Sequence, residues 1–257
     1  MNTKTLSPRA LSVIDQYTHF SVGRAVCSVP YFNNKTVRAK AALRVRIGKG
    51  SPKDIHEEIT GIMVKQHVST EVIADESLKK LLTDNNIGID CSGFAYYILN
   101  AESEERGKGT LDKHLSFVNV HGFLKKIYAS LRPVENCDVE TLANDKNSKA
   151  IALKDIQPGD IITMLGGPDN NDRNHILVVN QIDYQNLAPM TIHYAHAVAY
   201  PEDGIYGTGI KKGTIEIVYP DKSILEGKWD EGGNVETTAR ILNRAKISKT
   251  EIRRLYI

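Results

Sequence analysis

The sequence contains no long apolar run. Its 257 residues are 41% hydrophobic and 25% charged, proportions that are ordinary for a globular domain. No stretch approaches the roughly 18 consecutive apolar residues of a membrane-spanning helix, and the N-terminal residues lack the apolar centre of a secretory signal peptide. We therefore expect no membrane span and a cytoplasmic location, while export by a route that the sequence does not show stays open.

Cysteine is scarce. The chain has three cysteines, Cys27, Cys91 and Cys137, which lie far apart and form no C-x-x-C pair. Such a set does not build a disulfide framework, and it is typical of a reducing compartment. The tight ligand spacing of structural zinc sites is also missing. We therefore expect no metal and no cofactor, and any cysteine chemistry has to come from a single thiol.

The sequence also has no excess of charge of one sign. Its 33 Lys and Arg residues nearly balance 31 Asp and Glu residues, for a formal net charge of +2. This balance gives no argument for a nucleic-acid partner or an anionic membrane surface. The G-K-G-S stretch at residues 48–51 lacks the G-x-x-x-x-G-K-[ST] spacing of a phosphate-binding loop. Nothing in the composition indicates an oligomeric state.

The pattern of apolar residues changes twice along the chain. The first part contains helix starts in which Ser is followed by Pro, at Ser7 and Ser51. Residues 151–219 contain short strand-like runs with no helix between them, which favours an antiparallel sheet. From about residue 235 to 256 the spacing becomes helical again. We divide the chain into residues 1–85 (a helical N-terminal extension or insertion packed on the core), 86–220 (the core) and 221–257 (a helical C-terminal extension).

The stretch D-C-S-G-F at residues 90–94 organises the chain. A turn signal precedes it and an unbroken apolar run follows it, so we expect a loop that enters a helix capped by Asp90 or Ser92. Cys91 would then lie at the helix N-terminus, where free N–H groups and the helix dipole favour a thiolate. The ordinary alternative is a buried Cys that serves as a small apolar residue. This stretch alone leaves both interpretations open.

Two patterns later in the chain can be read together with D-C-S-G-F. A Pro-Gly-Asp turn at residues 158–160 leads into one strand-like run, and His175 opens the next run, N-H-I-L-V-V. His196 follows within I-H-Y-A-H-A. Taken in this order after D-C-S-G-F, the patterns resemble the NlpC-like cysteine peptidases of the papain-like superfamily, to which the CHAP amidases are related. The resemblance covers about residues 86–200 and implies an α+β, papain-like core with the Cys-bearing helix packed on an antiparallel sheet.

The resemblance also implies roles for three side chains. Cys91 matches the nucleophile, His175 the general base and His196 the polar residue that orients the imidazole. A base that takes and returns a proton near neutral pH suits His, whose unperturbed pKa is about 6.5, and a partner on its second nitrogen fixes its tautomer. His193 competes with His196 for the third role, although the two point to opposite faces of a regular strand.

Three further residues are candidates on the substrate side. The backbone N–H of Cys91 or Ser92 would stabilise the oxyanion, and Asp90 braces the turn. NlpC-like enzymes usually carry a P-Y-x-x-G-G type segment shortly before the Cys, and its Tyr helps to form the site. The similar stretch here, V-P-Y-F, lies far upstream at residues 29–32. We predict that an inserted segment separates Tyr31 from Cys91 in the sequence but not in space.

These patterns predict a thiol-dependent hydrolase that cleaves an amide bond through an acyl-enzyme. A peptide or peptidoglycan fragment is the expected substrate, by resemblance alone. One alternative is an acyltransferase or thioesterase that uses the same site, as in lecithin:retinol acyltransferase-like proteins. A second is a non-enzymatic binding module that retains the fold. A third is a zinc site made by Cys91, His175 and either His193 or His196.

Overall fold

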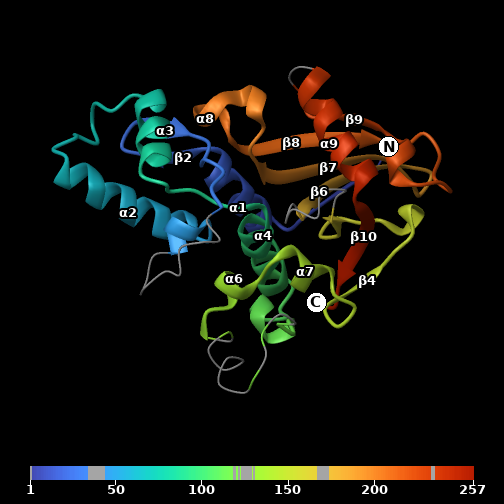
Figure 1. Ribbon diagram of the computed structural model, residues 1–257. Helices are drawn as coiled ribbons and strands as arrows, with labels where there is room; N and C mark the ends of the chain where they lie inside the picture. The colour runs from blue at the N-terminus through green and yellow to red at the C-terminus, as the bar shows by residue number, and fades with distance from the viewer. Residues whose placement is uncertain are drawn as a thin grey trace.

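A helix that begins at the D-C-S-G-F motif packs on an antiparallel sheet in the computed structural model (Figure 1). For residues 235–238 only the backbone is described. The described residues are 2–33, 44–117, 120, 122, 129, 131–166, 174–232 and 235–257.

The main sheet has eight strands among the described residues, and every pair of neighbours is antiparallel. The order across the sheet is β4-β10-β5-β6-β7-β8-β9, and β1 pairs with the second half of β6. A separate ribbon joins β2 to β3. The strands are β1 (Asn2–Thr5), β2 (Phe20–Val22), β3 (Ala25–Cys27), β4 (Ser148–Ala150), β5 (Ile161–Leu165), β6 (His175–Gln185), β7 (Ala188–Val198), β8 (Gly209–Glu216), β9 (Lys228–Asp230) and β10 (Lys249–Leu255).

The helices lie around this sheet, and none in the described residues is long and apolar enough to cross a membrane. The α-helices are α1 (Pro8–Thr18), α2 (Pro52–Lys65), α3 (Asp75–Asp84), α4 (Cys91–Glu105), α6 (Pro133–Asn136), α7 (Val139–Ala143), α8 (Gly204–Gly207) and α9 (Val235–Ile247). The 3₁₀ turns are η1 (Arg44–Ile47), η2 (Leu111–His114), η3 (Leu153–Asp155), η4 (Pro201–Asp203) and η5 (Ile224–Glu226).

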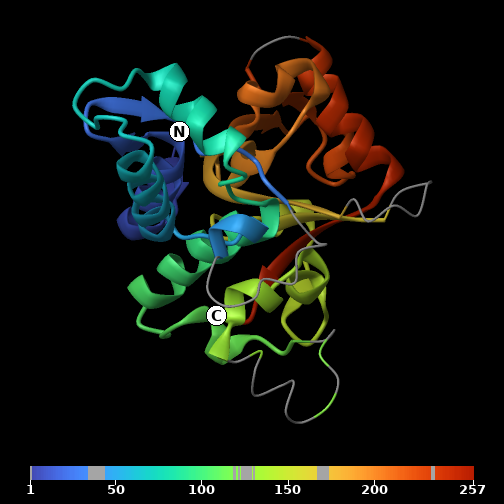
Figure 2. The same ribbon diagram turned by 60° about the vertical axis from the view of Figure 1, so that its left-hand side comes forward.

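Two apolar layers cover the two faces of the sheet. Along β6, Ile176 and Val178 pack into the cluster that contains α4, whereas Leu177 and Val179 pack into the cluster that contains α9. This division follows from the alternation of side chains along a strand. Figure 2 shows α9, in red, and α4, in green, on opposite sides of the strands. The predicted α+β class and the packing of the Cys-bearing helix on an antiparallel sheet are confirmed at this level.

The N-terminal residues join the same core. Both predicted Ser-Pro helix starts are confirmed, because Ser7 caps α1 and Ser51 caps α2. The ring of Tyr17 in α1 meets the ring of Phe94 in α4 edge-on at 5.4 Å. Strand β1, which the sequence pattern did not predict, adds to the main sheet beside β6. Residues 1–85 therefore contain strands as well as helices, and their described part contributes to the central core.

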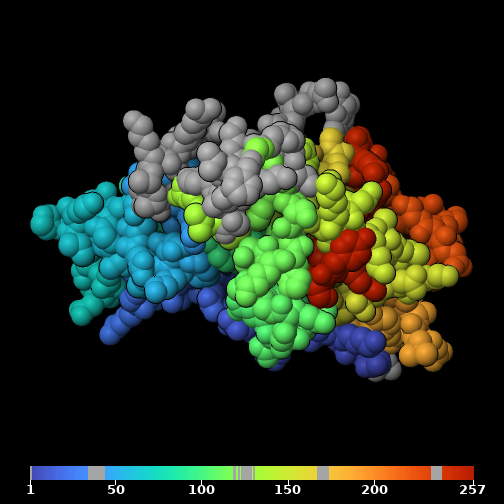
Figure 3. Space-filling view, turned by 90° about the horizontal axis from the view of Figure 1, so that it is seen from below, coloured from blue at the N-terminus to red at the C-terminus, as the bar shows by residue number. Residues whose placement is uncertain are grey.

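The prediction of a helical C-terminal extension over residues 221–257 was wrong for residues 228–230, which form β9, and for residues 249–255. After α9 the chain forms β10, which pairs with both β4 and β5 inside the sheet. The segment reads K-T-E-I-R-R-L, and Lys, Glu, Arg and Leu are good helix formers. Pairing with two distant strands outweighs this preference. Figure 3 shows the result at the surface, where the last residues, in red, lie against segments coloured green and yellow.

Candidate active site

Asp90 forms the turn that presents Cys91. Its Oδ1 accepts hydrogen bonds from the backbone N–H of Gly93 at 2.6 Å and from the Ser92 hydroxyl at 3.0 Å. The first of these bonds makes Asp90 the N-cap of α4, so that Cys91 is the first residue of the helix. The predicted loop, cap and helix are therefore confirmed, with Asp90 rather than Ser92 as the cap.

A buried ammonium group lies beneath this turn. Lys49, 7% exposed, donates hydrogen bonds from Nζ to Ser92 Oγ at 2.6 Å, to Cys137 O at 2.9 Å and to Asp90 Oδ1 at 3.0 Å. The sequence-based prediction missed this residue. The side chains of Asp90 and Ser92 are therefore both engaged with Lys49, which leaves the backbone N–H of Ser92 as the group that Ser92 can offer to a substrate.

The glycine before Lys49 has a packing role. Gly48 has a φ of +78°, and a Cβ added there would lie 2.0 Å from the carbonyl oxygen of Phe32. Its own carbonyl oxygen accepts the backbone N–H of Asp90 at 2.8 Å. Since only glycine fits this close approach with a left-handed backbone, the G-K-G stretch serves to fasten the Cys91 turn to the rest of the core.

Cys91 lies against the beginning of β6. Its Sγ is 4.0 Å from the carbonyl oxygen of Asn174, in the peptide group that leads into His175. The side chain is buried, with 5% of the residue exposed. The helix start that carries Cys91 thus lies beside the strand start that carries His175.

Burial decides the protonation of the thiol. It raises the pKa of Cys91 to about 11, and the nearby Asp90 carboxylate raises it further, whereas Lys49 and the Ser92 N–H act in the opposite direction. The expectation that the helix N-terminus favours a thiolate is therefore wrong for this resting state. Burial likewise raises the pKa of Cys27 to about 11 and of Cys137 to about 12, so the pKa alone does not single out Cys91.

Two buried histidines contact each other directly. Nε2 of His175, at the start of β6, lies 2.7 Å from Nδ1 of His196 in β7. They are 1% and 0% exposed. Burial, then the positive charge of Arg244, then His196 lower the pKa of His175 well below its ordinary value, so the imidazole is neutral. His193 instead lies 2.7 Å from Asp183 by its Nε2, and the structure brings only His196 to His175.

The chain of contacts continues beyond His196. Nε2 of His196 is 2.8 Å from Oε1 of Glu231, a residue that the sequence-based prediction missed. The hydroxyl groups of Tyr194 and Tyr200 donate to the two oxygens of this carboxylate at 3.0 Å and 2.8 Å. Burial raises the pKa of Glu231, but His196 and the two hydroxyl groups together bring it below its ordinary value. The carboxylate is therefore ionised.

Tyr31 lies close to the Cys91 turn, although it is distant in the sequence. It forms a parallel bridge with Ile89, two residues before Cys91. The N–H of Phe32 also donates to the carbonyl oxygen of Ile89 at 3.2 Å. Burial, and after it the Cys91 sulfur, raise the pKa of the Tyr31 hydroxyl above its ordinary value. The neighbourhood that the sequence predicted is present, whereas the role of Tyr31 stays a prediction.

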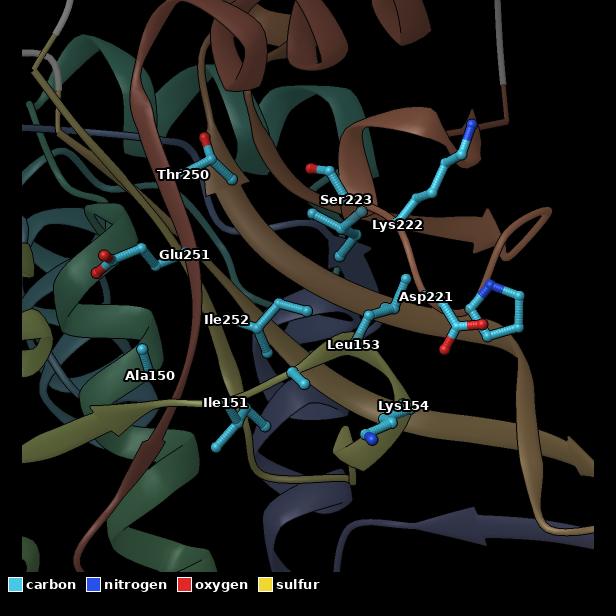
Figure 4. Close-up of a pocket in the computed structure, with 13 residues that line it drawn as sticks. Ala150, Ile151, Leu153, Lys154, Asp221, Lys222, Ser223, Thr250, Glu251 and Ile252 are labelled. Atoms are coloured by element: carbon cyan, nitrogen blue, oxygen red, sulfur yellow. The ribbon is translucent and has the colours of Figure 1, made fainter.

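Other features of the molecule lie apart from this site. Among the residues that the structure describes, no group of three or more side chains is arranged to hold a metal ion, so the zinc alternative gains no support. A pocket of about 430 Å³ lies at the sheet edge formed by β4 and β10 (Figure 4). Its walls are residues 150–154, 220–224 and 250–252, and they include neither Cys91, Lys49, Tyr31 nor the histidines and Glu231 described in this section.

The neutral His175 makes folding stability depend on pH. Its folded pKa lies below the unfolded value of about 6.5, so the unfolded chain binds the extra proton and stability falls as the pH drops below about 6.5. We expect a loss of about 1.4 kcal/mol for each pH unit from there down to the folded pKa. Urea unfolding at pH 7.5, 6.5 and 5.5 measures this slope. His175→Asn should flatten it, and the exposed control His67→Asn should not; equal slopes in all three proteins contradict the assignment.

Comparison of the chain with protein-family models, with curated proteins and with solved structures gave no match. The likeness to NlpC-like peptidases therefore rests on the motifs of the sequence.

Proposed function

We propose that the protein is a thiol-dependent hydrolase that cleaves an amide bond through an acyl-enzyme on Cys91. One arrangement supports this most. The Cys91 sulfur lies 4.0 Å from the peptide oxygen that precedes His175, and His175 in turn lies 2.7 Å from His196. A nucleophile, a base and a group that holds the base follow one another in this order, as in the papain-like enzymes that the sequence resembles.

The two ring nitrogens of His175 divide the work. Nε2 is engaged with His196, and we assign to Nδ1 the exchange of a proton with Cys91. Because the pKa of Cys91 is raised and that of His175 is lowered, the resting pair is a thiol and a neutral imidazole. The proton then moves from sulfur to Nδ1 as the sulfur attacks, and the imidazolium lasts only while the oxyanion does.

The reaction proceeds in two halves. The Cys91 sulfur bonds to the substrate carbonyl carbon, and the resulting oxyanion lies near the N–H groups of Cys91 and Ser92 at the α4 N-terminus. The C–N bond breaks as His175 returns the proton to the leaving amine, and a thioester remains. A water molecule then gives a proton to His175 and its oxygen to the carbonyl carbon. The C–S bond breaks, the carboxylic acid leaves and the thiol takes the proton back.

A peptide of the peptidoglycan type is the substrate class that we propose, on the sequence resemblance. The experiment incubates the protein with soluble peptidoglycan fragments and with a panel of short peptides, and follows the products by mass spectrometry. We expect two fragments whose masses add up to the substrate plus one water, and a transient acyl adduct on the Cys91 peptide. Cys91→Ala should abolish both, whereas Cys27→Ala, which removes a half-buried thiol elsewhere, should abolish neither.

Other outcomes decide among the alternatives. Cleavage that survives Cys91→Ala contradicts the proposal, and so does a panel that gives neither cleavage nor an adduct. Transfer of the acyl group from Cys91 to an added amine or alcohol in place of water identifies an acyltransferase. Binding of a fragment by both wild type and Cys91→Ala, without turnover, identifies a binding module.

Tyr31 gives a separate prediction. If its hydroxyl contacts the reacting carbonyl, Tyr31→Phe removes one neutral hydrogen bond and should lower kcat about tenfold. The ring and its packing stay, so the melting temperature should change little. Tyr206→Phe is the matched control, because the Tyr206 hydroxyl is bonded to Lys80 and Asp84 at the surface. Unchanged turnover in Tyr31→Phe removes Tyr31 from the site.

A further inference from the structure

Glu231 closes the buried end of the histidine pair. It directly follows β9 and is 4% exposed. One of its oxygens faces His196 and Tyr194, and the other accepts from Tyr200. A buried charge requires donors on its oxygens, and this carboxylate has them on both.

The contact between His196 and Glu231 requires a proton between them. Nε2 of His196 makes no hydrogen bond of standard geometry, yet this nitrogen and the carboxylate oxygen of Glu231 are only 2.8 Å apart. Two lone pairs at this distance would repel each other, whereas a charge-assisted hydrogen bond has this length. Since an ionised carboxylate only accepts, the proton belongs to Nε2 of His196.

This proton determines the tautomers of both rings in the state in which His196 carries no second proton. A neutral His196 with its proton on Nε2 has an unprotonated Nδ1, which accepts from His175. His175 therefore carries its proton on Nε2, and its Nδ1 is free. The reverse arrangement, with the proton of His196 on Nδ1, would leave His175 with its proton on Nδ1. In that tautomer His175 could not take the thiol proton of Cys91.

We propose that Glu231 is a positioning residue that holds His175 and His196 in the tautomers with Nδ1 unprotonated. The inference rests on the proposed function for its effect on turnover, but it concerns the protons of the two rings and can be tested without a substrate. Tyr194 and Tyr200 support it by keeping the carboxylate ionised, because each donates and neither competes for the proton of His196.

The first test is nuclear magnetic resonance of the 15N-labelled wild type, in which two-bond correlations show which ring nitrogen of each histidine carries hydrogen. We expect hydrogen on Nε2 and none on Nδ1 in both His175 and His196. Hydrogen on Nδ1 of His175 in the wild type overturns the inference, and this result requires no variant to fold.

The second test uses Glu231→Gln, whose amide can donate to His196 as well as accept from it. We expect a second population with hydrogen on Nδ1 of His175 and a kcat about 10–100-fold lower at unchanged KM, the cost of one charge-assisted hydrogen bond. Glu226→Gln is the control, because Glu226 pairs with Lys222 at the surface. Unchanged histidine tautomers in a folded Glu231→Gln overturn the inference.

The two proposals fail in different ways. If the ring protons respond to Glu231→Gln as expected but the wild type cleaves no amide, the hydrolase proposal fails and the positioning role stands. If the wild type cleaves an amide through Cys91 but Glu231→Gln alters neither the ring protons nor kcat, the positioning role fails and the hydrolase proposal stands.

Discussion

Replacing Lys49 by Met is expected to lower the free energy of unfolding by about 3–5 kcal/mol, the usual cost of removing one partner of a buried ion pair. Met fills a similar volume, so the loss comes from the polar groups left behind. The Asp90 carboxylate loses its buried counter-ion, and Ser92 Oγ and the Cys137 carbonyl oxygen lose a donor. Urea unfolding of the variant and the wild type at pH 7.5 measures the difference.

Two further variants separate charge from packing. Lys53→Met, in which an exposed Lys on α2 loses its 3.8 Å pair with Glu57, should change stability by no more than about 0.5 kcal/mol. The double variant Lys49→Met with Asp90→Asn should recover part of the loss, because Asn still caps the helix but carries no charge. A loss in Lys49→Met as small as that in Lys53→Met shows that the cluster does not hold the Cys91 turn.

Local signals in the sequence were sufficient to predict the helix starts, because residues close in the sequence determine those starts. Ser7 and Ser51, each followed by Pro, predicted the starts of α1 and α2, and Asp90 predicted the start of α4. These caps are hydrogen bonds across three residues, so a short stretch contains all the information. The same holds for the opposite faces of His193 and His196, which follow from the alternation along one strand.

The features of the site that the sequence did not predict depend on segments that come into contact only in the folded chain. Lys49 is 88 positions from Cys137, and Glu231 is 37 positions from Tyr194. In the sequence Lys49 and Glu231 are next to glycines, and a charged residue next to glycine is ordinarily expected in a turn at the surface. The pKa of Cys91 was misjudged for the same reason: the helix N-terminus is visible in the sequence, whereas the burial that outweighs it is not.

Among the variants that keep Cys91, replacing His175 by Ala should have the largest effect on turnover, a kcat about 10²–10⁴-fold lower, because general-base help of this size is lost. The thiol of Cys91, whose pKa burial raises to about 11, then has no acceptor for its proton near neutral pH. KM should stay within about twofold, since the lost interaction is made in the transition state. His193→Ala is the matched control, because His193 pairs with Asp183 on the other face of β7. An equal loss in both variants contradicts the assignment of His175 as the base.

His196 is expected to act only through His175, and the double variant tests this. His196→Ala removes the partner that holds Nε2 of His175 at 2.7 Å, so it should lower kcat by less than His175→Ala does. If His196 has no other role, removing it from a protein that already lacks His175 costs nothing more, because residues that work as a unit are not additive. The double variant should therefore turn over at the rate of His175→Ala. If the kcat losses of the two single variants multiply in the double variant, His196 serves the reaction by a contact of its own. That result would contradict the assignment of His196 as the residue that holds the base.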